Sequence, residues 1–208
     1  MIRMKKQSFI ILSFLLVLAG MFTSCEEVEK AGKYDNWRER NEAFIDSLNA
    51  LKPVNVFAME NFNAIEEGQL FKIQVQSTST TNEPQYIYCK KITKKSTGDL
   101  PIYTSAVSAY YYGTTILGDK FDGNFTGYTA LDKTFSGNKE PNTEFDVPAD
   151  FSVSGLIPGW TTALQYMLAG ERWMLYIPWQ SAYGSGGNSN IMGYSTLAFD
   201  IELLSVNN

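Results

Sequence analysis

Apolar residues recur with a period of two in several segments of the chain, which is the pattern of strands with one buried face. The alternation is clearest in residues 70–76 and 197–203. Residues 86–92 and 106–112 are further strand candidates, and Gly113 is expected to end the second of these. A chain with this many strand segments is expected to build its core on a β-sheet.

Two segments have helical spacing instead. Residues 35–51 are expected to form one helix, with Asp35 as its cap, that packs on its own domain or on a partner. A shorter helix is expected to begin near Pro158 and to end at Gly170, a residue type that suits the end of a helix. Many strands and one short central helix predict an α+β fold in which a sheet wraps around the helix.

The stretch from residue 123 to residue 148 follows neither period. It is rich in Gly, Asn, Thr and Asp, and it contains Pro141 and Pro148. This composition is typical of a long loop or insertion.

The N-terminal segment is expected to be an export signal. Basic residues at positions 3, 5 and 6 precede an apolar run over residues 9–18, and Cys25 follows small and polar residues. This order is that of a secretory signal, and the run is shorter than the roughly 20 residues of a bilayer span. The residues before Cys25 resemble a bacterial lipobox, which implies that residues 1–24 are removed and that Cys25 is lipidated. A plain signal peptide and an uncleaved anchor are the alternatives.

Acidic residues follow Cys25 directly, at positions 26, 27 and 29. They resemble the surface-export signal of some Bacteroidetes lipoproteins, and a solvated tether is the alternative. The predicted location is therefore the cell envelope, with a lipid anchor in the outer membrane and the domain facing either the periplasm or the surface.

Charge and residue usage exclude several classes of function. The net charge is −5 with no basic block beyond the extreme N-terminus, so no nucleic-acid partner is expected. The chain has no His, which excludes Ser-His-Asp and Cys-His catalysis and the usual His zinc sites. If Cys25 carries lipid, Cys89 has no internal disulfide partner, and it is expected to be a buried structural thiol.

Four segments within residues 84–206 carry a more specific pattern. The first is Tyr111-Tyr112-Gly113 followed by Gly118-Asp119-Lys120-Phe121-Asp122, and the second runs from Phe151 to Trp160 and ends in Ile157-Pro158-Gly159-Trp160. The third consists of Met167 and Gly170-Glu171, followed by Ile177-Pro178 and Ala182-Tyr183-Gly184. The fourth is Ile191 followed by Thr196 to Leu204. In this order they resemble the FKBP family of peptidyl-prolyl cis/trans isomerases.

The resemblance implies an FKBP-like antiparallel curled sheet around one short α-helix, with an N-terminal helical extension. It implies a tether and helix over residues 25–68 and an isomerase domain over residues 69–208, with an insertion at about 123–150. Trp160 resembles the floor of the family's proline pocket. Six residues resemble the walls of that pocket: Tyr111, Phe121, Phe151, Leu156, Ile157 and Phe199. Asp122 and Tyr183 resemble the polar residues at its rim, and Ile191 falls in the flap that closes one side.

The activity that the resemblance implies is rotation about X–Pro bonds of exported polypeptides, without a cofactor or metal. Rotation needs neither a nucleophile nor a proton transfer, so the absence of His is compatible with it. The implied partners are proline-containing polypeptides, FKBP-directed macrolides and, through Cys25, a membrane. A non-catalytic FKBP-fold module that grips a peptide is the alternative, and a glycan-binding adhesin is a further one.

Overall fold

The computed structural model describes residues 32–56, 62–76, 83–124 and 146–207. The chain divides into two compact units, residues 1–35 and 36–208. The predicted export signal, the lipidation site Cys25 and residues 125–145 of the predicted insertion lie outside the described residues. No helix within the described ranges is long and apolar enough to span a membrane.

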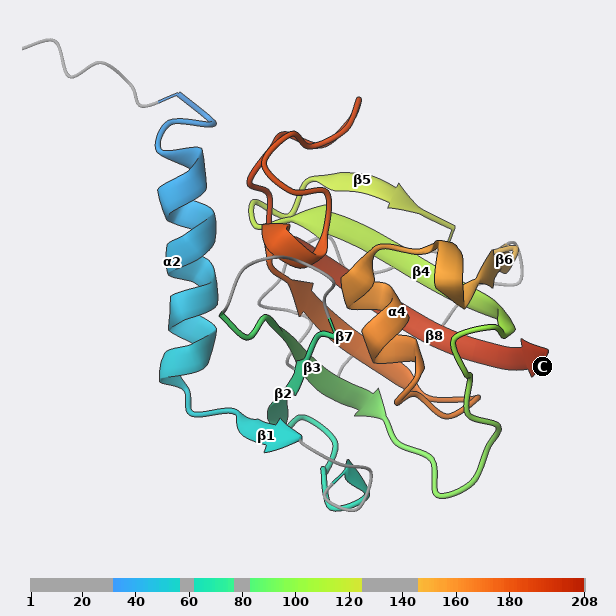
Figure 1. Ribbon diagram of the computed structural model, residues 1–208. Helices are drawn as coiled ribbons and strands as arrows, with labels where there is room; N and C mark the ends of the chain where they lie inside the picture. Colours follow the sequence, from blue (N-terminus) through green and yellow to red (C-terminus); the bar gives the residue numbers. More distant parts are fainter. Residues whose placement is uncertain (1–31, 57–61, 77–82, 125–145, 208) are drawn as a thin grey trace, which may run out of the picture. The chain divides into compact units, whose positions relative to one another are not determined.

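Eight strands of the described residues form one sheet in the order β1-β2-β3-β7-β8-β4-β5, and β6 also pairs with β4 (Figure 1). Every pairing is antiparallel except that of β1 with β2. The strands are β1 (Val54–Val56), β2 (Leu70–Gln74), β3 (Tyr86–Thr93), β4 (Ala106–Thr115), β5 (Lys120–Gly123), β6 (Ala149–Ser152), β7 (Arg172–Ile177) and β8 (Leu197–Asn207).

The four strands predicted from the sequence are confirmed as β2, β3, β4 and β8. The other four were not predicted, for two physical reasons. Strands β1, β5 and β6 have three or four residues each, which is too short to establish a period. Strand β7 is buried at all six positions, so its residues have no polar face to alternate with.

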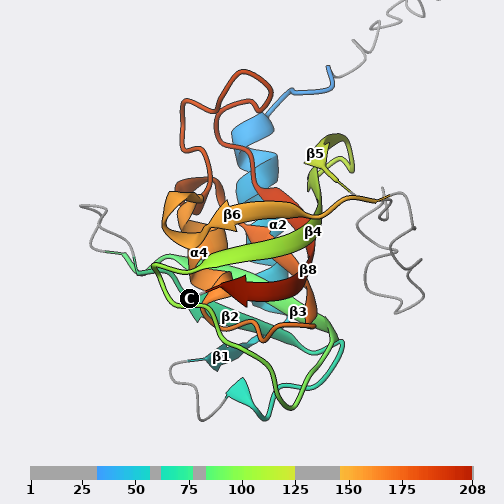
Figure 2. The ribbon, with the colours of Figure 1, turned by 90° about the vertical axis from the view of Figure 1, so that its right-hand side faces the viewer.

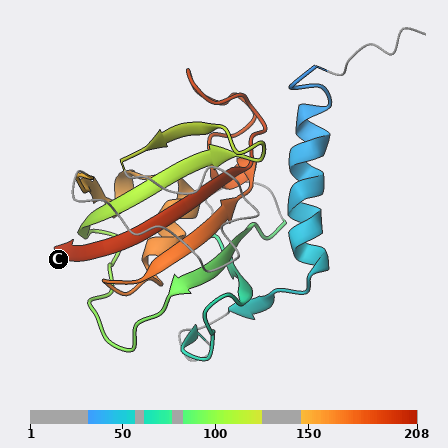
Figure 3. The ribbon, with the colours of Figure 1, turned by 180° about the vertical axis from the view of Figure 1, so that it is seen from behind.

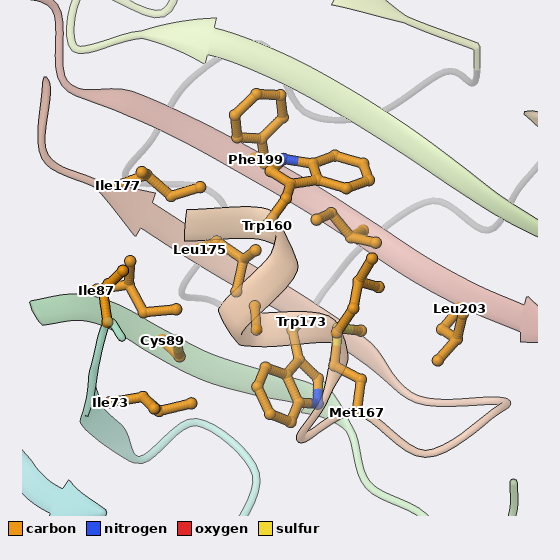
Figure 4. Close-up of a cluster of buried hydrophobic side chains, with 14 of the residues drawn as sticks. Ile73, Ile87, Cys89, Trp160, Met167, Trp173, Leu175, Ile177, Phe199 and Leu203 are labelled. Carbon is orange, nitrogen blue, oxygen red and sulfur yellow. The ribbon is translucent and has the colours of Figure 1, made fainter. Parts of the chain in front are cut away.

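Helix α4 (Pro158–Leu164) packs on one face of the sheet (Figure 2). Side chains from β3, β7 and β8 meet it in a single core that includes Cys89, Leu175 and Phe199 (Figure 4). The Cys89 thiol is free and fully buried, and burial raises its pKa well above the ordinary value. The prediction of a buried structural thiol is therefore confirmed, as is the antiparallel sheet packed on a short helix.

Helix α2 (Trp37–Ala50) packs on the opposite face of the same strands, near the start of β8 (Figure 3). Its Leu48 contacts a second buried cluster that includes Tyr88 and Tyr176, which are the sequence neighbours of Cys89 and Leu175. Successive residues of a strand point to opposite faces, so α2 and α4 cover opposite sides. The apolar face of α2 is thus used within its own domain.

The predicted cap of this helix is wrong. Asn36 occupies the N-cap position with a left-handed φ of 50° and makes no side-chain capping hydrogen bond. The Asp35 carboxylate instead accepts a hydrogen bond from Gly32 N at 2.6 Å, in the turn that precedes the helix. A carboxylate bonded to the preceding turn is not placed to accept from the first helical amides.

Gly113 does not end its strand, contrary to prediction. Strand β4 continues through it, and Gly113 pairs with Phe199 of β8 and with Asp122 of β5. A Cβ at this position would lie 2.7 Å from Phe199 Cε1 and 2.8 Å from Phe121 Cζ. Glycine is present here because two rings pack onto the strand, and not because the chain turns.

The predicted end of the second helix is also wrong. Helix α4 ends at Leu164, and the chain continues in tighter turns in which Met167 N bonds to Leu164 O at 3.1 Å. Gly170 has the left-handed φ of 87° that its residue type suggested, but it belongs to the turn that leads into β7.

Candidate active site

Trp160 is positioned by the first turn of α4. Pro158 occupies the first helical position, where its missing N–H leaves no intrahelical bond unmade. Gly159 lets this turn lie directly on β7, because a Cβ there would be 2.8 Å from Ile177 Cδ1. The Trp160 indole is thereby held against the sheet and is 4% exposed (Figure 4).

Three aromatic rings contact that indole. The ring centroids of Tyr111, Phe151 and Phe199 lie 5.5, 5.5 and 5.2 Å from that of Trp160, each in an edge-to-face arrangement. Phe121 joins through Phe199, at 5.4 Å. These five residues form what we call the aromatic cluster. Edge-to-face pairs contribute about 0.5–1.5 kcal/mol each beyond area burial, so the rings fix one another's orientation.

The members of the aromatic cluster come from different elements, namely β4, β5, β6, α4 and β8 in chain order. Strand β4 organises them, because β5, β6 and β8 all pair with it. Strand β6 pairs with the first half of β4, and β5 pairs with the second half. Rings far apart in sequence therefore meet around Trp160.

Asp122 and two tyrosine hydroxyls form a polar group beside the aromatic cluster. The Tyr111 hydroxyl donates a hydrogen bond to Asp122, and burial together with this carboxylate raises the pKa of Tyr111 to about 12. Tyr183 is 40% exposed, and burial followed by the charge of Asp122 raises its pKa as well. Both phenols therefore stay protonated at neutral pH and can donate hydrogen bonds.

Three predicted site residues remain, and all lie against the same core. Leu156 and Ile157 are half-buried and pack on the core that contains Trp160. Ile191 is 4% exposed and belongs to that core directly. The structure thus brings every pocket residue expected from the sequence into the aromatic cluster, the polar group beside it or the adjoining core.

The main-chain N–H of Ile157 is an available donor at this site. Ile157 is the N-cap of α4, where amides lack an intrahelical acceptor. Within residues 32–56, 62–76, 83–124 and 146–207 this N–H has no hydrogen-bond acceptor, whereas the Ile157 carbonyl accepts from Thr161 N at 3.1 Å. A carbonyl of a bound ligand can supply the missing acceptor.

Asn124 is a site-positioning residue that sequence reasoning missed. Its side-chain oxygen accepts from Tyr111 N at 2.8 Å, and its side-chain amide donates to Ala109 O at 3.2 Å. Its own N–H donates to Tyr111 O at 3.0 Å. Asn124 thereby holds the main chain of Tyr111, and nothing in an Asn- and Gly-rich stretch marks it for this role.

Among the described residues, no group of three or more His, Cys, Asp or Glu could hold a metal.

Residues 104–204 match the model of a known family, described as FKBP-type peptidyl-prolyl cis-trans isomerase. This segment is therefore similar to the FKBP family. It begins just before β4 and extends into β8, so it contains all of the aromatic cluster. Helix α2 and strands β1, β2 and β3 lie outside the match.

Individual relatives agree with this assignment. The chain is 33% identical over 117 residues to the FKBP-type 22 kDa peptidyl-prolyl cis-trans isomerase of Escherichia coli, covering 56% of this chain and 48% of the relative. It is 38% identical over 117 residues to the outer membrane protein MIP of Legionella longbeachae, covering 56% and 42%. The chain thus spans less than half the length of the curated relatives it matches.

The fold is similar to that of a solved FKBP-type protein. The crystal structure of FkpA from Escherichia coli is 26% identical, with a TM-score of 0.50, and the match covers 99% of this chain and 71% of that one. The expected FKBP-like sheet, short helix and N-terminal helix are therefore confirmed as a fold.

Proposed function

We propose that this chain catalyses cis/trans isomerisation of X–Pro bonds in polypeptides. The observation that carries the proposal is the aromatic cluster around Trp160, together with the nearby Ile157 amide, which has no hydrogen-bond acceptor among the residues that the structure describes. The match of residues 104–204 to the FKBP-type isomerase family supports the same reaction.

The reaction requires partial loss of amide resonance, whose barrier is about 18–20 kcal/mol. A twisted amide has a less charge-separated carbonyl than a planar one. An apolar pocket that excludes water therefore binds the twisted form better than the planar form, which is differential binding of the transition state. Each 1.4 kcal/mol of this preference accelerates rotation about tenfold.

Each part of the site has a distinct role in this proposal. Trp160, Phe151 and Phe199 enclose the pyrrolidine ring, and Tyr111 and Phe121 complete the enclosure. The Ile157 N–H holds the substrate carbonyl beside the prolyl bond, with Leu156 and Ile191 against the flanking residues. Asp122 orients the Tyr111 hydroxyl, and the Tyr183 hydroxyl donates a further hydrogen bond at the rim.

We expect Trp160→Leu to lower kcat/KM for a proline-containing tetrapeptide about tenfold. Leu keeps an apolar floor but loses the three edge-to-face contacts and part of the surface that faces the proline ring, which corresponds to about 1.4 kcal/mol of transition-state binding. The measurement is a protease-coupled isomerisation assay, with an FKBP-directed macrolide tested as a competitor.

Tyr34→Leu is the control, because it removes an exposed ring from the described turn of the other compact unit. Its kcat/KM should equal that of the unchanged chain. If the folded, unchanged chain gives no rate above the uncatalysed reaction, catalysis is ruled out. Proline-peptide binding without turnover would then favour a non-catalytic peptide-binding module.

We further propose that the chain works in the cell envelope on exported polypeptides, anchored by lipid at Cys25. The order of residues before Cys25 and the similarity to an outer membrane protein support this location. Growth with a labelled fatty acid should label the unchanged chain and leave Cys25→Ala unlabelled. Equal labelling of the two chains would contradict an anchor at this cysteine.

A further inference from the structure

The segment before β8 is a loop with a rigid shape. We call residues 184–195 the flap loop. Within it, the Asn188 side chain accepts a hydrogen bond from Ile191 N at 2.8 Å, and Asn188 N donates to Ile191 O at 2.8 Å. Gly187 lies so close to the Ile191 carbonyl that a Cβ there would collide with it. A loop bonded this tightly to itself changes position mainly by moving about its base.

Helix α2 holds one side of that base. The Asn41 side-chain oxygen accepts from Thr196 N at 2.7 Å, and the Thr196 hydroxyl donates to Asn41 O at 3.4 Å. Both residues are fully buried. Thr196 is the donor and Asn41 the acceptor in both bonds. Two buried hydrogen bonds between the same residues fix the main chain where the flap loop enters β8, because breaking them leaves buried polar groups unpaired.

A second connection reaches into the flap loop itself. The Trp37 indole N–H donates to Ser195 Oγ at 3.0 Å, and Ser195 Oγ donates to Met192 O at 2.6 Å. The Arg38 guanidinium lies 4.8 Å from the ring centroid of Tyr194, a residue between Met192 and Ser195 in the sequence. The chain of bonds from Trp37 therefore ends on the residue next to Ile191.

Two residues of the candidate site depend on the position of this loop. Ile191 lies within it and belongs to the same buried core as Trp160. Tyr183 directly precedes it, and the base is closed by a hydrogen bond from Tyr194 N to Gly184 O at 3.0 Å. A shift of the base would therefore move both the apolar flank and the rim hydroxyl of the site.

We propose that α2 is a positioning element of the substrate pocket, acting on the flap loop through the Trp37–Ser195–Met192 hydrogen bonds and the Asn41–Thr196 pair. This inference rests on the proposed isomerase function. Helix α2 lies outside residues 104–204, so the working unit is larger than the segment that matches the family.

The test compares variants of the full-length chain in detergent. Ser195→Ala removes the hydroxyl that links Trp37 to Met192, and we expect kcat/KM for a proline peptide to fall about fivefold. Hydrogen exchange of the flap-loop amides should become about fivefold faster, while exchange in β3 and β7 stays unchanged. Ser195→Thr keeps a hydroxyl at this position and should restore both values to within about twofold.

Asn49→Ala is the matched control. Asn49 also joins α2 to the sheet, by accepting a hydrogen bond from Lys72 Nζ at 2.9 Å, but this bond is exposed and goes to β2. It should change neither kcat/KM nor flap-loop exchange. Should Ser195→Ala not fold, Trp37→Phe removes the indole donor while keeping an aromatic ring, and the same losses are expected.

A kcat/KM for Ser195→Ala that matches Asn49→Ala would overturn the inference, and so would faster loop exchange with an unchanged kcat/KM. If the unchanged chain itself has no isomerase activity, the proposed function fails. Flap-loop exchange then decides separately whether α2 holds the loop, since that measurement needs no turnover.

Discussion

Gly113→Ala should lower kcat/KM about 100-fold while leaving the protein folded. The new Cβ would lie 2.7 Å from Phe199 Cε1 and 2.8 Å from Phe121 Cζ, against an ordinary carbon–carbon contact of roughly 3.5–4.0 Å. Both rings must move by about 1 Å, and Phe199 packs on Trp160. Misplacement of this size in a site that works by enclosure removes most of its preference for the twisted amide.

The protein should survive this change because overpacking costs about 1–3 kcal/mol, against a typical stability of about 5–15 kcal/mol. Unfolding in urea checks stability, and the tetrapeptide assay checks activity. Gly155→Ala is the control: a Cβ at Gly155 has Ser152 Cβ, at 4.0 Å, as its nearest neighbour. A Gly113→Ala chain with activity within about threefold of the unchanged chain would show that the two rings are not part of the working pocket.

We expect Glu171→Ala to lower the free energy of unfolding by about 3–5 kcal/mol, the largest loss from a single side chain that we predict. Glu171 is fully buried and pairs with Lys91, which is 2% exposed, at an N···O distance of 3.3 Å. Its carboxylate also accepts from Trp173 Nε1 at 3.0 Å and Leu168 N at 3.1 Å. Lys95 N donates to it as well, at 3.2 Å. Removing the carboxylate therefore leaves a buried ammonium and three further donors without this acceptor.

The pKa of Lys91 also supports a large loss of stability in Glu171→Ala. Burial lowers it, and the neighbouring Glu171 partly offsets that effect, so the charged form depends on the carboxylate. Glu66→Ala is the matched control, because Glu66 pairs with Lys94 at 3.0 Å but is 73% exposed, and it should cost less than about 1 kcal/mol. Urea unfolding of both variants gives the comparison. A loss below about 1.5 kcal/mol for Glu171→Ala would mean that Lys91 finds another stabilising environment.

The parts of the fold that the sequence predicts are those set by local constraints. Alternation over residues 70–76 and 197–203 predicted β2 and β8, and the strand-like segments 86–92 and 106–112 predicted β3 and β4. The start of α4 was predictable too, since proline is favoured at the first position of a helix and Pro158 occupies that position.

The parts that it did not predict depend on contacts between distant residues. An isolated glycine usually marks a turn, so the pattern at Gly113 predicts a strand end. Its real constraint is the two rings that pack onto it, one of them on β8. The Asn41–Thr196 bond joins residues 155 positions apart, and a polar residue in a helix carries no local sign of such a partner. Single-sequence patterns could therefore name the residues of the aromatic cluster by family resemblance, but not the residues that hold them in place.

The place of β8 in the sheet has a consequence for biogenesis. It joins β7 on one side to β4 on the other, although it follows both in the chain. A nascent polypeptide that has emerged as far as residue 196 carries two incomplete sheets, one ending at β7 and one at β4, with no strand to connect them. Assembly must wait for the last strand and then proceed through long-range pairing, which is slow and leaves unpaired edges exposed in the meantime. This chain, proposed to assist the folding of other proteins, therefore exposes unpaired strand edges until its own last strand has paired.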